Sequence, residues 1–141
     1  MIYWIRLVVV TGLFLIGISA WTIAPLQSKL QASIDRGKII YTQQCLSCHM
    51  MDGGGVQSMN PPLIRTKWVL GDKADLITIV LKGMNSGVEI DAVQYHNIMA
   101  SHADLSDQQI ADVLTYIRNG FGNKAKAVTE AEVKTVRAKT H

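Results

Sequence analysis

Cysteine is scarce in this chain of 141 residues, and its scarcity excludes several kinds of site. The only two cysteines are Cys45 and Cys48. A structural zinc site needs four cysteine or histidine ligands, usually grouped in pairs. A thioredoxin-like C-x-x-C lies near a βαβ unit, and this chain lacks a strand-rich half. There are no internal repeats, and a net charge of only +3 is too small to argue for nucleic-acid binding.

The two cysteines belong to the segment Cys45-Leu46-Ser47-Cys48-His49. This is the C-x-x-C-H pattern of c-type haem attachment. Each thiol adds to one vinyl group of the porphyrin, and the two intervening residues let both sulfurs reach the same edge of the ring. The imidazole that follows is then held under the iron, where a neutral ring nitrogen can ligate it. A disulfide of this spacing would leave His49 without a role, so the segment predicts covalent haem.

A long apolar run without charge occupies residues 7–24. In a helix such a run spans about 27 Å, close to the thickness of the hydrocarbon layer of a membrane. Aromatic residues flank it on both sides, as in the belts of membrane spans, whereas Ile18-Ser19-Ala20 is a passable signal-peptide cleavage site. Residues 1–24 are therefore expected to be a signal peptide or a transmembrane anchor, and the aromatic flanks favour the anchor. Under either interpretation, the rest of the chain is exported from the cytoplasm.

The remaining chain divides by composition into three parts. Residues 25–33 are expected to be a polar linker, because Pro25 ends the apolar helical pattern. Residues 34–123, where acidic and basic side chains nearly balance, are expected to form one small domain with a modest core that a haem would complete. Residues 124–141 are expected to be a basic, solvated C-terminal extension with a short helix from about Glu130 to Ala138.

Three stretches combine apolar residues at helical spacing with capping residues at their ends. The expected helices run over 36–45 with Ser33 or Asp35 as the cap, over 72–83 with Asp72 as the cap and Gly83 as the stop, and over 106–119 with a capping box of Ser106 and Gln109. Residues 84–98 are expected to form a loop with a short strand pair. These elements predict an all-α domain around one haem, preceded by an apolar N-terminal helix.

Together, these motifs resemble class I cytochrome c. The residues that carry the resemblance are Gly37 and Tyr41, the C-x-x-C-H segment, the Pro62-Leu63 turn, Met99, and Val113 with Tyr116. The amino-acid sequence of residues 67–72, 105–107 and 114–119 more narrowly resembles that of bacterial mono-haem cytochromes. Those cytochromes are fused to, or work beside, quinoprotein sugar and alcohol dehydrogenases. The resemblance covers about residues 36–123.

The resemblance implies a class I cytochrome c fold with a crossing of the first and last helices. The contacts at this crossing are expected between Gly37 and Tyr41 on one helix and Val113 and Tyr116 on the other. Glycine would be needed at position 37 because a side chain there would hold the two helices apart.

The resemblance also implies contacts around the haem. The carbonyl of Pro61, or of Pro62, is expected to accept the second N–H of His49, which would fix the ring and raise its basicity. Leu63 is expected to pack on the haem. Trp68 is expected either to reach a haem propionate or to be buried as ordinary core.

For the second axial ligand, the resemblance implies a methionine shortly before the last helix, and Met99 stands there. Many relatives have proline directly after this methionine, whereas Ala100 follows it here. A bis-histidine site would have a lower reduction potential than a histidine–methionine pair. The other candidates are Met50, Met51 and Met59, which follow His49 closely, Met84, which is expected in the core, and His96 and His102.

The function that the resemblance implies is one-electron transfer, with haem iron ligated by His49 and Met99 and no catalytic residues. The expected partners are an exported dehydrogenase or respiratory complex as donor and an oxidase or another cytochrome as acceptor. The expected location is the periplasmic side of the bacterial inner membrane, or the periplasm if residues 1–24 are cleaved. Two alternatives stay open: a haem-based sensor or peroxidase-like enzyme with a labile sixth ligand, and a structural subunit that haem stabilises.

Overall fold

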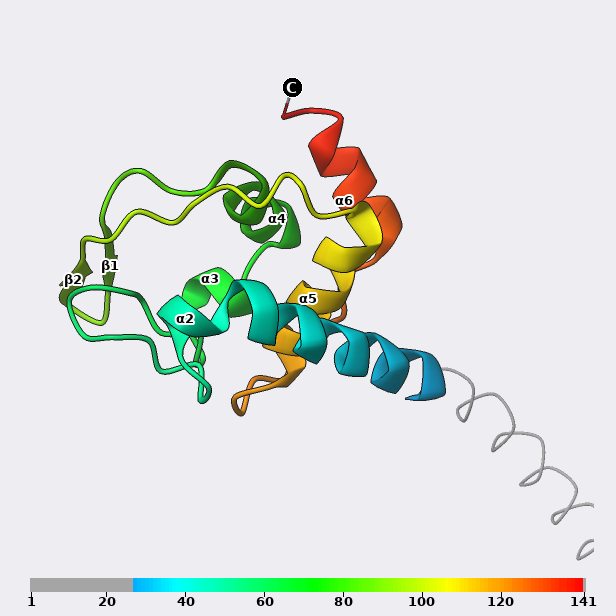
Figure 1. Cartoon of the computed structure of the whole chain (residues 1–141), viewed down its shortest axis with the longest axis horizontal. Coiled ribbons are helices and arrows are strands. Elements are labelled where there is room, and N and C mark those ends of the chain that lie inside the picture. Colours follow the sequence, from blue (N-terminus) through cyan, green and yellow to red (C-terminus); the bar gives the residue numbers. More distant parts are fainter. Residues whose placement is uncertain (1–26, 141) are drawn as a thin grey trace, which may run out of the picture. The chain divides into compact units, whose positions relative to one another are not determined.

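The computed structural model describes residues 27–140 (Figure 1), so the predicted anchor or signal segment lies outside the described residues. The chain forms two compact units, Met1–Ala32 and Ser33–His141. In the first unit, the described residues 27–32 are helical. Within the described part of the chain, no helix has both the length and the apolar character that crossing a membrane requires.

Helices dominate the second unit, as predicted, and the chain has an all-α architecture with one small hairpin (Figure 1). Its elements in chain order are helical residues 33–44, α2 (Leu46–His49), α3 (Lys67–Leu70), α4 (Lys73–Lys82), β1 (Val88–Ile90), β2 (Val93–Tyr95), α5 (Asp107–Asn119) and α6 (Glu130–Arg137). The hairpin pairs Val88 with Tyr95 in antiparallel register, at the residues where a strand pair was expected.

The ends of α4 and α5 are the ones that the sequence predicts. The Asp72 carboxylate accepts the Ala74 N–H at 2.7 Å, and Gly83 ends α4 with a φ of 72°. At the start of α5, Ser106 and Gln109 form both hydrogen bonds of the capping box. These bonds satisfy N–H groups that have no partner inside the helix.

The first helix starts earlier than predicted. Residues 27–33 are already helical, so neither Ser33 nor Asp35 caps its beginning, and much of the expected linker is helix. Residues 26–32 contain no proline or glycine, and most of them are good helix formers, which explains the continuation. The Ser33 hydroxyl instead donates to the Asp112 carboxylate on α5 at 2.6 Å.

This first helix crosses α5 at Gly37, as the family resemblance implies. A Cβ added at Gly37 would overlap the backbone carbonyl of Asp112 and would lie 2.8 Å from Cβ of Tyr116. The rings of Tyr41 and Tyr116 pack at 5.4 Å between centroids. The closest approach is therefore at Asp112. Val113, which was expected at this contact, instead lines a cavity.

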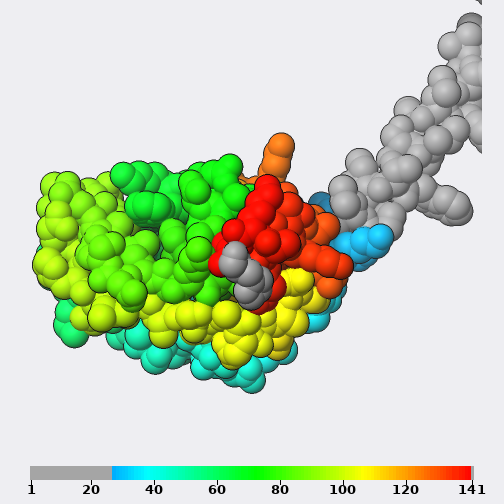
Figure 2. Space-filling model, turned by 90° about the horizontal axis from the view of Figure 1, so that it is seen from above, coloured from blue at the N-terminus to red at the C-terminus, as the bar shows by residue number. Residues whose placement is uncertain are grey.

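The C-terminal extension contains the expected short helix, α6, but it is packed onto the domain, so the expectation of a solvated tail was wrong. Helix α6 packs against α4 and α5, and Figure 2 shows it lying over these segments. Val133 on α6 is completely buried, and Glu132 pairs with Lys73 of α4 at 2.8 Å. The Thr115 hydroxyl of α5 donates to the carbonyl of Val128 at 3.1 Å. Two buried valines, Val128 and Val133, attach this segment to the domain.

Candidate functional site

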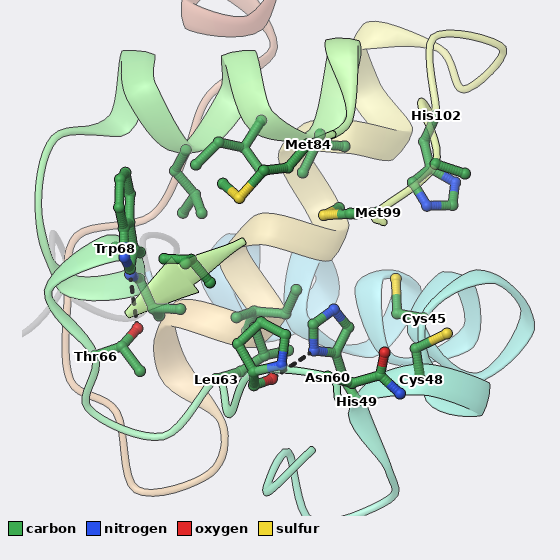
Figure 3. Close-up of a pocket in the computed structure, with 18 of the residues that line it drawn as sticks. Cys45, Cys48, His49, Asn60, Leu63, Thr66, Trp68, Met84, Met99 and His102 are labelled. Atoms are coloured by element: carbon green, nitrogen blue, oxygen red, sulfur yellow. Dashed lines mark hydrogen bonds between the residues drawn. The ribbon is translucent and has the colours of Figure 1, made fainter. Parts of the chain in front are cut away.

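A deep, mostly apolar cavity enters the second unit between α2, α4, α5 and the hairpin (Figure 3). Its walls include the buried side chains of α4 and α5: Leu76, Val80, Val113, Leu114 and Ile117. Among the described residues that line it, none is Asp, Glu, Lys or Arg. A cavity of this kind suits a large apolar ligand whose few polar groups meet specific donors.

One wall of the cavity carries the three residues of the C-x-x-C-H motif. The single turn of α2 brings Cys45, Cys48 and His49 to one face, because residues three and four positions apart are neighbours on a helix. Figure 3 shows both sulfurs and the imidazole on the same side of the cavity. The two cysteines are not joined in a disulfide, and burial raises the pKa of the Cys45 thiol to about 11, with Cys48 contributing.

The imidazole of His49 is held in a defined orientation. Its Nδ1 lies 2.9 Å from the Pro61 carbonyl oxygen, so in the neutral ring Nδ1–H donates to this carbonyl (Figure 3). Burial lowers the pKa of His49, and nearby His102 acts in the same direction, while the Pro61 bond opposes them. The neutral imidazole therefore keeps the lone pair of Nε2 available for a metal.

The loop that carries Pro61 is fixed by Asn123, a residue outside the motifs described above. The Asn123 amide donates to the carbonyls of Leu63 and Ile117 at 2.9 and 2.8 Å. Its oxygen accepts the N–H of Arg65 at 2.8 Å. Asn123 thus ties the loop beside His49 to the end of α5. A single asparagine after a glycine-rich turn gives no sequence pattern that would reveal this role.

Two methionines lie on the wall opposite the cysteines and His49. Met84 and Met99 form an isolated antiparallel bridge, and both line the cavity. Figure 3 shows the Met99 thioether across the cavity from the His49 ring. Of the other candidate ligands only His102 lines the cavity. Those that do not are Met50, Met51, Met59 and His96, all exposed.

Trp68 presents a buried polar atom without a partner. It lines the cavity, away from the cysteines in Figure 3, and its indole Nε1 has no hydrogen-bond partner among the described residues. Leaving a buried donor unpaired is costly, so such an atom calls for a ligand acceptor. A propionate carboxylate of haem would provide it. The cavity therefore offers two cysteine sulfurs, a neutral imidazole, an indole donor and apolar walls. Together these residues fit haem c.

Comparison with known proteins agrees with this site. Residues 34–121 match the family model of cytochrome c. Cytochrome c-552 of Thermus thermophilus is 35% identical over 112 residues, which cover 73% of this chain and 85% of that protein. The cytochrome c subunit of the quinone alcohol dehydrogenase of Gluconacetobacter polyoxogenes is 36% identical over 103 residues, 72% of this chain and 22% of that subunit. The chain therefore belongs to the cytochrome c family, and its cofactor is covalently bound haem c.

Proposed function

We propose that this chain is a one-electron carrier whose haem c is attached to Cys45 and Cys48 and ligated by His49 and Met99. When bound, the haem supplies an iron that alternates between the ferrous and ferric states and so holds one electron. The observation that carries the proposal is the oriented His49 imidazole facing the Met99 thioether across an uncharged cavity. With His49 and Met99 both holding the iron, no open position would remain for a substrate, which favours electron transfer over substrate chemistry at the metal.

The residues of the chain have distinct tasks in this proposal. The Pro61 carbonyl orients His49 and raises its basicity, as hydrogen-bond partners of metal ligands generally do. Leu63 packs against the core at the cavity wall and excludes water. Trp68 donates from Nε1 to a propionate. Cys48 is exposed, so its thioether would bring an edge of the cofactor to the surface, where a partner protein can exchange an electron.

The relatives support a dehydrogenase as electron donor. Three of them are named as the cytochrome subunits of a quinone alcohol dehydrogenase, a gluconate 2-dehydrogenase and a fructose dehydrogenase. This chain spans about a quarter or less of each of these subunits. We propose that it receives electrons from an exported dehydrogenase or respiratory complex, and passes them to an oxidase or another cytochrome.

The proposed location follows from the sequence of residues 1–24, which is uncharged and apolar from residue 7 onward. A retained apolar helix would tether the cytochrome to the periplasmic side of the bacterial inner membrane. Cleavage of the same segment would instead leave it in the periplasm.

Reduction by a partner tests the function directly. Ferric protein is mixed with a purified quinoprotein alcohol dehydrogenase and its alcohol, and the haem absorption is followed in a stopped-flow spectrometer. We expect reduction that requires both enzyme and alcohol, and ferrous protein that does not bind carbon monoxide. Rapid carbon monoxide binding together with peroxide consumption would favour the peroxidase-like alternative. Reduction by no donor would favour a structural subunit.

A further inference from the structure

Arg118 on α5 is a buried cation that has no carboxylate partner among residues 27–140. The residue is 4% exposed. Its Nη1 donates to the carbonyls of Val69 and Gly71 at 2.6 and 3.2 Å, and its Nε donates to that of Lys126 at 2.9 Å. No ion pair among the described residues includes Arg118. These carbonyls accept from Nε and Nη1 and leave the unit charge of the guanidinium in place.

The acids nearest to this guanidinium are engaged elsewhere. Glu132 pairs with Lys73 at 2.8 Å, and Asp72 caps α4. Both act on the pKa of Arg118 only through space, and burial lowers that pKa. A guanidinium nevertheless stays protonated in proteins. The interior of the second unit therefore contains a positive charge that water screens only weakly.

This charge lies directly behind the wall of the haem cavity. Val69, whose carbonyl accepts the shortest of these bonds, is 1% exposed and lines the cavity. Its neighbour Trp68 carries the unpartnered Nε1 that we assign to a propionate. Ile117, which precedes Arg118 on α5, lines the cavity as well. The guanidinium is thus bonded to the backbone of a residue whose side chain lines the cavity.

We infer that Arg118 sets the reduction potential of the haem through its charge, in addition to holding α3. This inference rests on the electron-carrier function proposed above. The cavity lining has no Asp, Glu, Lys or Arg of its own, so Arg118 supplies fixed charge where the lining has none. The reduced haem centre carries one positive charge fewer than the oxidised centre. A nearby buried cation therefore favours the reduced form and raises the potential.

The test compares two substitutions that damage the hydrogen bonds but differ in charge. Arg118→Gln removes the cation and keeps an amide donor, whereas Arg118→Lys keeps the cation and loses the planar fork. The potential of each purified holoprotein is measured by spectroelectrochemistry, together with its thermal unfolding. We expect both variants to unfold at a lower temperature than wild type. Only Arg118→Gln should lower the equilibrium constant for haem reduction by at least threefold. This corresponds to a reduction potential about 28 mV lower, since a tenfold change equals 59 mV for one electron.

Controls separate a local charge from net charge and from folding. Lys124→Met removes one positive charge from an exposed position and should leave the equilibrium constant for haem reduction within twofold of wild type. If Arg118→Gln does not fold, Arg118→His replaces it, and its potential should fall with pH more steeply than that of wild type as the imidazole loses its proton. Equal potentials for Arg118→Lys and Arg118→Gln, or an unchanged slope for Arg118→His, would overturn the inference. Failure of the electron-carrier function would appear separately, as no reduction of wild type by any donor.

Discussion

Met84 and Met99 exchange both of their backbone hydrogen bonds, at 2.9 and 3.0 Å, so two thioethers enter the same cavity side by side. Figure 3 places the Met99 sulfur across from His49. We therefore expect Met99→Ala to abolish the near-infrared sulfur-to-iron absorption band of the ferric protein, admit carbon monoxide to the ferrous protein and lower the potential. A thioether favours the reduced state relative to the ligands that would replace it.

Met84→Ala is the matched control for this prediction, because it removes the same side chain from the paired residue. Its band, carbon monoxide response and ligation should equal those of wild type. Retention of the band in Met99→Ala would identify Met84 as the ligand. Loss of six-coordination in His102→Ala would instead indicate an imidazole.

Covalent attachment is the second prediction. Under denaturing mass spectrometry, the purified protein should be heavier than its polypeptide by the mass of one haem. The double variant Cys45→Ala, Cys48→Ala should lose this added mass, because both thioether bonds are gone. Extraction of haem from wild type into acidified acetone would contradict the attachment.

Gly37→Val should destabilise the fold without altering the iron ligands. A side chain at this position meets the backbone of Asp112, which cannot move without separating the first helix from α5. Overpacking of this kind costs about 1–3 kcal/mol. Chemical denaturation measures the loss, and Ile39→Val, at a 60% exposed position of the same helix, is the control that should stay near wild type. Equal stability of Gly37→Val and wild type would show that the two helices do not pack there.

Asn123→Ala should loosen the loop beside His49. The change leaves the buried carbonyl of Ile117 without this donor, at about 1–3 kcal/mol for an unsatisfied buried group, and also removes the half-buried bonds to Leu63 and Arg65. Asn119→Ala removes one hydrogen bond, from Asn119 to the carbonyl of Thr115 within α5, and should lower the free energy of unfolding by less. Thermal unfolding and amide exchange of residues 63–65 distinguish the two variants. Faster exchange in both variants to the same extent would argue against this role of Asn123.

Membrane attachment is the fifth prediction. If residues 1–24 are retained, the protein should sediment with membranes and resist washing with high salt and alkali. A mature N-terminus at Trp21, determined by mass spectrometry, would show that the segment is a cleaved signal.

The sequence predicts best where one local pattern is enough to specify the structure. The helix over 107–119 has both apolar periodicity and a capping box, and the structure reproduces both. The haem motif needs five consecutive residues, and one helical turn brings its three functional side chains together.

Prediction is poorest where a role depends on contacts distant in the chain. Arg118 lies in a helix of clear amphipathic pattern, and nothing local shows that its guanidinium reaches carbonyls of α3. The four residues of α3 are too few for periodicity. The basic composition of residues 124–141 suggested a solvated tail, because two buried valines contribute little to an average over the segment.

The family match ends at residue 121, yet the folded body continues well beyond it. Val133 is fully buried, and Lys73 and Thr115 both bond to groups after residue 127. A piece cut at the family boundary for fusion to another protein would therefore expose the apolar flanks of α4 and α5. The folded domain therefore includes α6, and we expect a piece that folds on its own to extend at least to Arg137.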